Sequence, residues 1–373
     1  MPQQLYPLIH SIGTANPINK IAQKAHLNVI ENTSNLSRAQ LLLTKKVYNN
    51  SGISYRYSVL DEFDGAPDKQ RFIFNTPTDQ PVLSVAKRMQ LFEKYAPALC
   101  KDAVMNCLSQ LPDLNKSRIT HLITFSCTGM YAPGLDIQLV EQLELPLNVE
   151  RTCINFMGCY AAINALKSAY HIARSEPDAV VLIAGVELCT LHYRDAEEQD
   201  QVVANALFAD GAAAAIVSLS PLNGDGRGLC IKNFYSEFDS SGSNEMVWAI
   251  GDHGFDLRLS SYVPALIQKS IFTLTEKLLQ RAQLKQSDIN YYALHPGGVK
   301  ILSACEAALI ITPQQNKLSY EVLNDYGNMS SVTILFVLKK YMQSFTAADK
   351  GNKLLACAFG PGLTMESMIA EVC

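Results

Sequence analysis

Residues 158–174 read GCYAAINALKSAYHIAR. After the glycine and cysteine, apolar residues recur every three or four positions, which predicts an amphipathic helix. Two apolar runs flank it and predict buried strands, at 121–126 (HLITFS) and 179–186 (AVVLIAGV). Residues 208–219 (FADGAAAAIVSL) predict an Asp-Gly turn that leads into another strand. Buried strands that alternate with helices are typical of the α/β class.

The C-terminal part of the chain repeats this order. Residues 291–294 (YYAL) predict a strand that ends at His295. Residues 327–341 (GNMSSVTILFVLKKY) then predict a helix, and 353–362 (KLLACAFGPG) and 365–372 (MESMIAEV) predict two further strands. The recurrence indicates that one pattern of elements is used twice.

Matching positions in the two parts are almost equally spaced. Cys127 and Cys159 are 32 residues apart, and His295 and Asn328 are 33 residues apart. We therefore expect a duplicated, layered fold with a pseudo-twofold axis. In it, Cys159 and Asn328 open equivalent helices, and Cys127 and His295 end equivalent strands. All four residues can then converge where the halves meet.

The turn-rich segment PLNGDGRG (221–228) is the best candidate for a boundary between the halves. A chain of 373 residues, 48% of them apolar, can bury a large core. We expect an N-terminal half at 1–220, which carries Cys159, and a C-terminal half at 221–373, which carries His295 and Asn328.

Charge and hydropathy exclude several classes of protein. The net charge of −4 offers no basic field for nucleic acid or for an anionic membrane. No apolar run approaches the roughly 20 residues of a membrane-spanning helix. The first 17 residues lack the layout of a signal peptide, so we expect a cytoplasmic protein.

The chain has ten cysteines but no CxxC pair and no Cys/His spacing that suits zinc, so we expect no metal site. In a chain of this length most of them are expected to be buried and reduced, as small apolar side chains. A catalytic cysteine must be recognised by its local context.

Cys159 and His295 each have such a context. Cys159 lies at a predicted helix start, where the partial positive charge lowers the pKa of a thiol; the alternative is a core cysteine under a helix. His295 follows a buried strand and precedes Pro-Gly-Gly, a position where functional residues gather; the alternative is a structural or merely exposed histidine.

Asn328 alone suggests a helix N-cap, but the three residues together suggest chemistry. A cysteine and a histidine can form a thiolate–imidazolium pair, and an asparagine can add an amide donor. The histidine and asparagine N–H groups can also form an oxyanion hole. No carboxylate in a matching position is a candidate general base, which suits a carbanion formed by decarboxylation.

At these motifs the sequence resembles the type III polyketide synthases, the chalcone synthase-like enzymes, and among them the microbial members. The resemblance covers nearly the whole chain, and the order and spacing of its motifs make it specific. The motifs are SIGTANP (11–17), SCTGMYAPGLD (126–136), MGCYAAINAL (157–166), GVEL (185–188), ALFADGAAA (206–214), LHPGG (294–298), YGNMSS (326–331) and AFGPGLTMES (358–367).

This resemblance implies a thiolase-like, five-layered αβαβα fold and a homodimer. It implies that Cys159 takes an acyl starter from its CoA ester, and that His295 and Asn328 hold malonyl-CoA and stabilise the enolate left by decarboxylation. Repeated Claisen condensation and cyclisation then give a pyrone, resorcinol or phloroglucinol. The substrates are CoA thioesters, and no metal or redox cofactor is implied.

The resemblance also implies residues that bind substrate. Phe208 matches an aromatic gatekeeper, although plain core packing would also explain it. A second gatekeeper is either Phe255 or Leu257. Lys46 matches a residue that meets the CoA phosphates, with Lys45 or Arg56 as substitutes. Further residues match cavity walls: Cys127, Cys189, His192, Ser330, Phe359, Gly360, Pro361 and Gly362.

The chain departs from the plant enzymes at three of these positions and at one other. Threonines of those enzymes are replaced by Cys127, Cys189 and His192, and a methionine that crosses their dimer is replaced by Ala132. We expect the first three residues to tune product length and cyclisation.

Other functions use similar residues. The alternatives are a single-round ketoacyl synthase III-like enzyme and a catalytically silent paralogue. A hydroxymethylglutaryl-CoA synthase would need a catalytic glutamate in the first half, for which no motif is found. A papain-like hydrolase uses the same three residue types, but the duplication argues against it.

Overall fold

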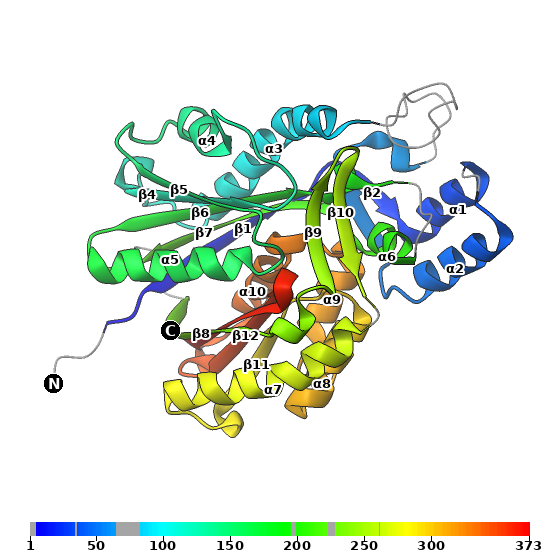
Figure 1. Cartoon of the computed structure of the whole chain (residues 1–373). Helices are drawn as coiled ribbons and strands as arrows, with labels where there is room; N and C mark the ends of the chain where they lie inside the picture. Colours follow the sequence, from blue (N-terminus) through cyan, green and yellow to red (C-terminus); the bar gives the residue numbers. More distant parts are fainter. Residues whose placement is uncertain (1–4, 34–35, 65–82, 195–198, 223–227, 261) are drawn as a thin grey trace.

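The computed structural model describes residues 5–33, 36–64, 83–194, 199–222, 228–260 and 262–373 (Figure 1). Its largest element is a nine-stranded sheet in the order β5-β4-β6-β7-β1-β8-β13-β12-β11. The strands are β1 (Leu8–Ala15), β4 (His121–Ser126), β5 (Glu150–Asn155), β6 (Val180–Leu188), β7 (Asp210–Ser218), β8 (Leu229–Phe238), β11 (Ile289–Leu294), β12 (Lys353–Gly360) and β13 (Thr364–Val372).

The sheet consists of two blocks with the same topology. In the first block β4 is parallel to β6, and β6, β7 and β1 follow antiparallel to one another. In the second block β11 is parallel to β12, and β12, β13 and β8 follow in the same way. The blocks join where Leu8 and Ile9 of β1 pair with Cys230 and Leu229 of β8. The predicted duplication of an α/β fold is confirmed.

Helices cover both blocks and fill the space between them, which gives the five layers (Figure 1). The outer helices of the first block are α3 (Val85–Leu108) and α4 (Leu135–Leu143), those of the second are α7 (Val263–Ala282) and α8 (Val299–Leu309), and the central ones are α5 (Ala161–Ser175) and α10 (Thr333–Ser344). One apolar cluster joins α5 and α10 to both blocks, and two others lie under the outer helices.

The sequence of α5 explains its central place. Its buried face is built largely from alanines, including Ala162, Ala165 and Ala169, and the facing strand β7 carries Ala212–Ala215. Small side chains let a helix lie close to a sheet on each side at the density of a protein interior.

Smaller elements complete the chain around this core. They are the helices α1 (Gln23–Thr33), α2 (Arg38–Asn49), α6 (Gln199–Leu207) and α9 (Lys317–Tyr326), the short helices η3 (Cys189–His192) and η6 (Ser330–Val332), and two ribbons, β2 (Asn19–Ala22) with β3 (Tyr55–Ser58) and β9 (Met246–Gly251) with β10 (Gly254–Leu259). No described helix is both long enough and apolar enough to cross a membrane.

The structure corrects two local predictions. Asp210 and Gly211 are the first residues of β7 rather than a turn, because the Asp210 carboxylate accepts hydrogen bonds from Val59 N–H and from the N–H and hydroxyl of Thr190. Asn328 does not open its helix, because α10 begins only at Thr333.

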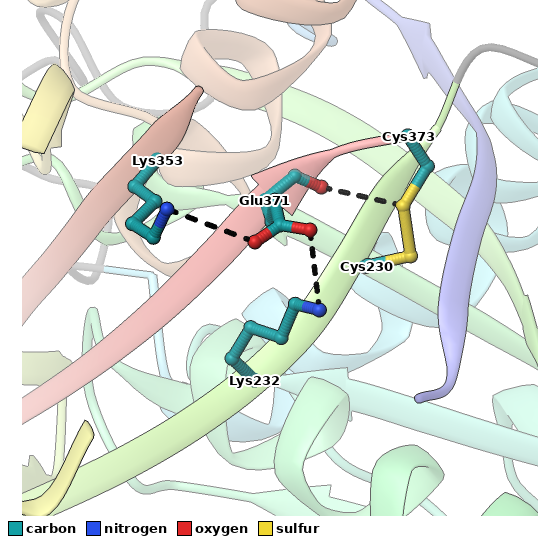
Figure 2. Close-up of a disulfide and its surroundings, with 5 residues drawn as sticks. All are labelled: Cys230, Lys232, Lys353, Glu371 and Cys373. Atoms are coloured by element: carbon teal, nitrogen blue, oxygen red, sulfur yellow. Dashed lines mark hydrogen bonds and ion pairs between the residues drawn. A yellow bond between two sulfur atoms is a disulfide. The ribbon is translucent and has the colours of Figure 1, made fainter. Parts of the chain in front are cut away.

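Two cysteines are not reduced. Cys230 of β8 and Cys373, which follows β13, form a disulfide (Figure 2). Beside it, Glu371 pairs with Lys232 at 3.3 Å and with Lys353 at 3.8 Å. This pair is the exception to the prediction that most cysteines are buried and reduced, and it becomes adjacent only when β8 and β13 align. The other eight cysteines are free, and six of them are buried.

Candidate active site

A largely apolar cavity lies between the two halves and collects most of the predicted site residues. Its space, open mouth included, is about 1190 Å³. The lining includes Cys159, His295, Asn328, Phe208, Cys127, Cys189, His192, Ser330, Phe359 and Pro361. Gly360, Gly362 and Lys46 do not line it. The expected convergence of Cys127, Cys159, His295 and Asn328 is thus found.

Cys159 lies in a tight turn between β5 and α5. The turn is left-handed at Phe156 (φ 61°) and at Gly158 (φ 93°). A Cβ on Gly158 would lie 2.2 Å from Cδ of Pro361, so glycine lets the 359–362 loop lie directly on the turn. Gly360 allows the same closeness from the other side, since its Cβ would be 3.3 Å from Cys159 N. These two glycines explain why the loop forms a wall beside the cysteine.

Loss of solvation is the largest influence on the acidity of the Cys159 thiol. Burial raises its pKa to about 12; the Ser330 hydroxyl, 3.4 Å from Sγ, lowers the pKa, and the Glu187 charge raises it. The helix start was expected to lower this pKa, and that expectation is wrong. Helix α5 begins two residues later, at Ala161, so loss of solvation outweighs the helix dipole.

His295 presents an unengaged imidazole. Its backbone N–H donates to Cys357 O at 2.8 Å, which continues the pairing of β11 with β12. Neither ring nitrogen has a hydrogen-bond partner among the described residues, although the residue is only 2% exposed. Burial lowers the pKa of His295 to about 3, so the ring is neutral and offers one N–H donor and one lone pair.

Asn328 is held in an extended segment that pairs with Phe208 of the first half. Asn328 N–H donates to Leu207 O, and Ala209 N–H donates to Asn328 O, both at 2.9 Å. The side-chain oxygen accepts from Ser330 N–H at 2.9 Å. The amide NH₂ has no hydrogen bond with a described residue and remains free to donate in the cavity. This pairing also sets the gatekeeper candidate Phe208 beside Asn328.

Comparison with known proteins now places the chain. The family models for chalcone and stilbene synthases match residues 6–221 with the N-terminal domain and residues 234–373 with the C-terminal domain. The chain belongs to the chalcone and stilbene synthase family. It is therefore a type III polyketide synthase, an acyltransferase that uses malonyl-CoA and an acyl-CoA.

Its relatives agree with this assignment. The chain is 31% identical over 329 residues to the "Alpha-pyrone synthesis polyketide synthase-like Pks18" of Mycobacterium tuberculosis, with 88% of this chain and 81% of that protein covered. It is 30% identical over 362 residues to the "Probable polyketide synthase 1" of Dictyostelium discoideum, with 95% of this chain and 11% of that protein covered.

Solved structures show the same fold. PKS-I from the brown alga Ectocarpus siliculosus superposes with a TM-score of 0.92 at 28% identity and covers 100% of this chain and 99% of its own. The C-terminal type III polyketide synthase domain of Steely1 from Dictyostelium superposes with a TM-score of 0.89 at 27% identity, over 98% and 99% of the two chains.

In this polyketide synthase an aromatic cluster forms one wall of the cavity. The His192 ring stacks on Phe255 with centroids 4.0 Å apart, and Trp248 meets both rings edge-on. His192 Nε2–H donates to Thr128 O at 2.7 Å, and Phe255 N–H donates to Nδ1 at 3.0 Å. Burial lowers the pKa of His192 to about 3. The histidine therefore ties the β9–β10 ribbon to the end of β4 as a neutral ring.

Sequence reasoning missed Trp248, the single tryptophan of the chain. Its indole N–H donates to Cys127 O at 2.8 Å. Aromatic residues in VWAIGDHGFDLRL give little warning of this contact, because it depends on how the ribbon folds over the first half. Both Phe255 and Leu257, the two gatekeeper candidates, line the cavity.

Glu187 is the buried carboxylate next to this site, and it does not line the cavity. It accepts hydrogen bonds from Cys127 N–H, from the Thr128 hydroxyl at 2.7 Å and from the Ser331 hydroxyl. Burial raises its pKa. The carboxylate therefore links the end of β4, at Cys127 and Thr128, to Ser331 of the second half.

The candidates for binding the CoA phosphates differ in access. Lys46 is exposed near the end of α2, and Lys45 pairs with Glu31 at 3.2 Å. Arg56 is not suited to the role, because it is buried and donates to Asn205 O and Phe208 O, each at 2.7 Å. It braces the backbone next to Phe208 instead.

Proposed function

We propose that Cys159, His295 and Asn328 carry out the condensations of this polyketide synthase. The observation that supports the proposal is their common cavity, in which a thiol, an unengaged imidazole and a free amide NH₂ face the same space. The surrounding wall is mainly apolar, and a low-dielectric wall strengthens each of their polar interactions.

Loading of the starter needs a base, because the Cys159 thiol is protonated. His295 supplies it: the neutral ring takes the proton as Sγ attacks the carbonyl of the acyl-CoA. Collapse of the tetrahedral intermediate expels the CoA thiolate, and the imidazolium returns the proton to it. The acyl group is left as a thioester on Cys159.

Extension uses the two N–H donors. The malonyl-CoA thioester oxygen accepts hydrogen bonds from His295 and Asn328, and the carboxylate leaves as CO₂. The electron pair of the broken C–C bond forms an enolate, whose negative oxygen is held by the same donors. The enolate carbon attacks the acyl thioester, the Cys159 thiolate leaves, and the longer chain remains on CoA. Return of the chain to Cys159 repeats the cycle.

The cavity wall sets the length and folding of the product. Cys127, Cys189 and His192 lie in that wall, together with the gatekeeper Phe208. Because discrimination per methylene in a pocket is only about 1–3 kcal/mol, changes there shift a product spectrum rather than abolish it. Among the expected ring closures the lactone of a pyrone is favoured, since Pks18 is named for alpha-pyrone synthesis.

We propose that a second copy of the chain pairs with the free edge of β5. This strand hydrogen-bonds only to β4 within the described part of the chain, and five of its six residues are exposed. Met130 and Met157, four residues after β4 and two after β5, are each 37% exposed. An unpaired edge beside apolar side chains favours strand pairing between copies.

The absence of a cofactor and the cytoplasmic location remain proposals. In the described ranges no three His, Cys, Asp or Glu side chains gather to hold a metal ion. A chelator is expected to leave turnover unchanged, and a loss of turnover restored by a metal would contradict the cofactor proposal.

Product mass spectrometry tests the function directly. The purified protein is incubated with malonyl-CoA and acyl-CoA starters from acetyl to long-chain and aromatic. We expect polyketide pyrones with wild type and with Cys100→Ala, a control that removes another buried thiol, and none with Cys159→Ala. Products from Cys159→Ala would refute the assigned nucleophile. A single condensation with every starter would favour the ketoacyl synthase III-like reaction.

A further inference from the structure

Cys127 has every polar atom engaged around the active-site turn. Its N–H donates to the Glu187 carboxylate at 3.0 Å, and its carbonyl accepts from the Trp248 indole at 2.8 Å. Its Sγ accepts from Gly158 N–H at 2.9 Å and donates to Gly158 O, 3.3 Å away. One thiol therefore holds both polar groups of the residue that precedes Cys159.

The orientation of Gly158 determines where Cys159 points. Gly158 has φ of 93°, a conformation that glycine adopts without steric cost because it has no Cβ. Helix α5 begins at Ala161, whose N–H donates to Gly158 O at 3.0 Å, so the helix holds the carbonyl of Gly158 but not its N–H. The N–H of Gly158 is held by the Cys127 thiol at 2.9 Å, and Pro361 packs against the residue from the other side.

We propose that the Cys127 thiol is a positioning group for Cys159. It clamps the Gly158 backbone and so aims Cys159 Sγ at Ser330 and the cavity. The inference rests on the proposed function, in which Cys159 is the nucleophile, and it adds a role to Cys127 beyond that of a cavity wall.

Burial and charge suit Cys127 to this role. The side chain is 2% exposed. Burial, with the Glu187 charge next, raises the pKa of this thiol well above its usual value. A thiol that stays protonated can accept from an N–H and donate to a carbonyl at once, whereas a thiolate can only accept. For the same reason Cys127 is a poor second acceptor for acyl groups.

The matched pair Cys127→Thr and Cys127→Val tests the proposal. The two side chains have nearly the same shape, but only threonine has a hydroxyl that can accept from Gly158 N–H and donate to its carbonyl. Each variant is made in a Cys153→Ser background, because Cys153 is the exposed free cysteine and lies near Cys159 in sequence. Cys100→Ala serves as the control for loss of a buried thiol elsewhere.

The first readout is the rate of Cys159 alkylation by iodoacetamide, measured by mass spectrometry, which does not depend on the reaction assigned to the protein. We expect threonine to stay within about 3-fold of the parent and valine to fall about 10-fold, the effect of one hydrogen bond of about 1.4 kcal/mol. The second readout is turnover: kcat is expected to fall with valine in the same proportion, with little change in KM.

Equal alkylation rates and kcat values for the threonine and valine variants would overturn the proposal, as would a change in product length with no change in either rate. A folded Cys127→Ala variant is expected to show the same alkylation rate and kcat as Cys127→Val. The test itself is the comparison between the threonine and valine variants. Failure of the proposed function is seen separately, as products formed by Cys159→Ala.

Discussion

The two halves of the molecule have the same strand order but use their strand ends differently. In the first half β4 is followed by Cys127, whose thiol hydrogen-bonds to Gly158 of the same half. In the second half β11 ends at His295, whose ring has no partner among the described residues. The comparison teaches that duplication provides equivalent places for side chains, and that engagement by neighbours separates a supporting group from a reacting one.

The segments that carry Cys159 and Asn328 also differ in their contacts. Cys159 follows a glycine held by Cys127 and Pro361. Asn328, at the equivalent place, is extended and pairs across the halves with Phe208. The turn of the proposed nucleophile is thus held from both halves, by Cys127 of the first and Pro361 of the second, while Asn328 is placed by a single pairing with the first half.

Exchanging Cys159 and Asn328 between their positions should have the largest effect on product formation. In the double variant Cys159→Asn, Asn328→Cys the thiol lies in the second half, without the Gly158 turn. We expect product formation to fall at least about 10⁴-fold, in the range seen when a nucleophile is removed. Mass spectrometry of products and of acyl-enzyme measures this, with circular dichroism as the folding control. Appreciable turnover would show that the halves are functionally interchangeable.

Asn328→Asp should separate loading from extension. The aspartate retains an oxygen for Ser330 N–H but places a carboxylate where the enolate develops negative charge. We expect kcat to fall about 10²- to 10³-fold, the loss typical of one oxyanion donor. Loading of Cys159 with the starter, followed by intact mass, should continue. An unchanged kcat would remove Asn328 from the extension step.

A disulfide cross-links the second half and should stabilise the protein against unfolding. It links β8 to the end of β13 across a sequence separation of 143 residues, and no described cysteine pair closes the first half in this way. Cys373→Ser should lower the free energy of unfolding by about 2–4 kcal/mol under oxidising conditions. The difference from wild type should disappear in a reductant, and Cys153→Ser should show none. Equal stability in both conditions would mean that the bond does not form in solution.

The smallest expected effect concerns His295 and pH. Its pKa is about 3 in the folded protein, against about 6.5 when unfolded, so the unfolded chain binds the extra proton as pH falls below 6.5. This histidine should therefore cost about 1.4 kcal/mol of stability at pH 5.5 relative to pH 7.5. In urea unfolding, the His295→Gln variant should lose about 1.4 kcal/mol less stability than wild type between pH 7.5 and pH 5.5.

Other groups contribute to the pH dependence of stability in both wild type and His295→Gln. His192, with a pKa of about 3, acts in the same direction, and Asp210, whose pKa is raised to about 6, acts in the opposite one. Since both remain in the variant, the difference between the two proteins isolates His295. Identical losses would mean that the ring is protonated or solvated in the folded state.

The sequence was sufficient to predict features that lie within one helix or strand and features that recur in both halves. Apolar runs predicted β4, β6 and β11 nearly to the residue, and the spacing of Cys127, Cys159, His295 and Asn328 predicted their convergence. Periodicity and spacing can be read directly from a short stretch of sequence. Because the fold is duplicated, each pattern occurs twice and supports the other.

What could not be predicted depends on contacts between distant segments. The Cys230–Cys373 bond requires β8 and β13 to align. The carbonyls bound by Arg56 lie about 150 positions away in the chain. The pKa of Cys159 is set by burial under both halves, which a helix start in the sequence does not reveal.

The position of Trp248 has an optical consequence. Since the chain has one tryptophan and its indole binds Cys127 O in the cavity wall, all tryptophan emission of this protein originates in the wall of the candidate active site. The colour and intensity of that light should change as acyl chains enter and leave, so each step of polyketide growth can be followed without a label.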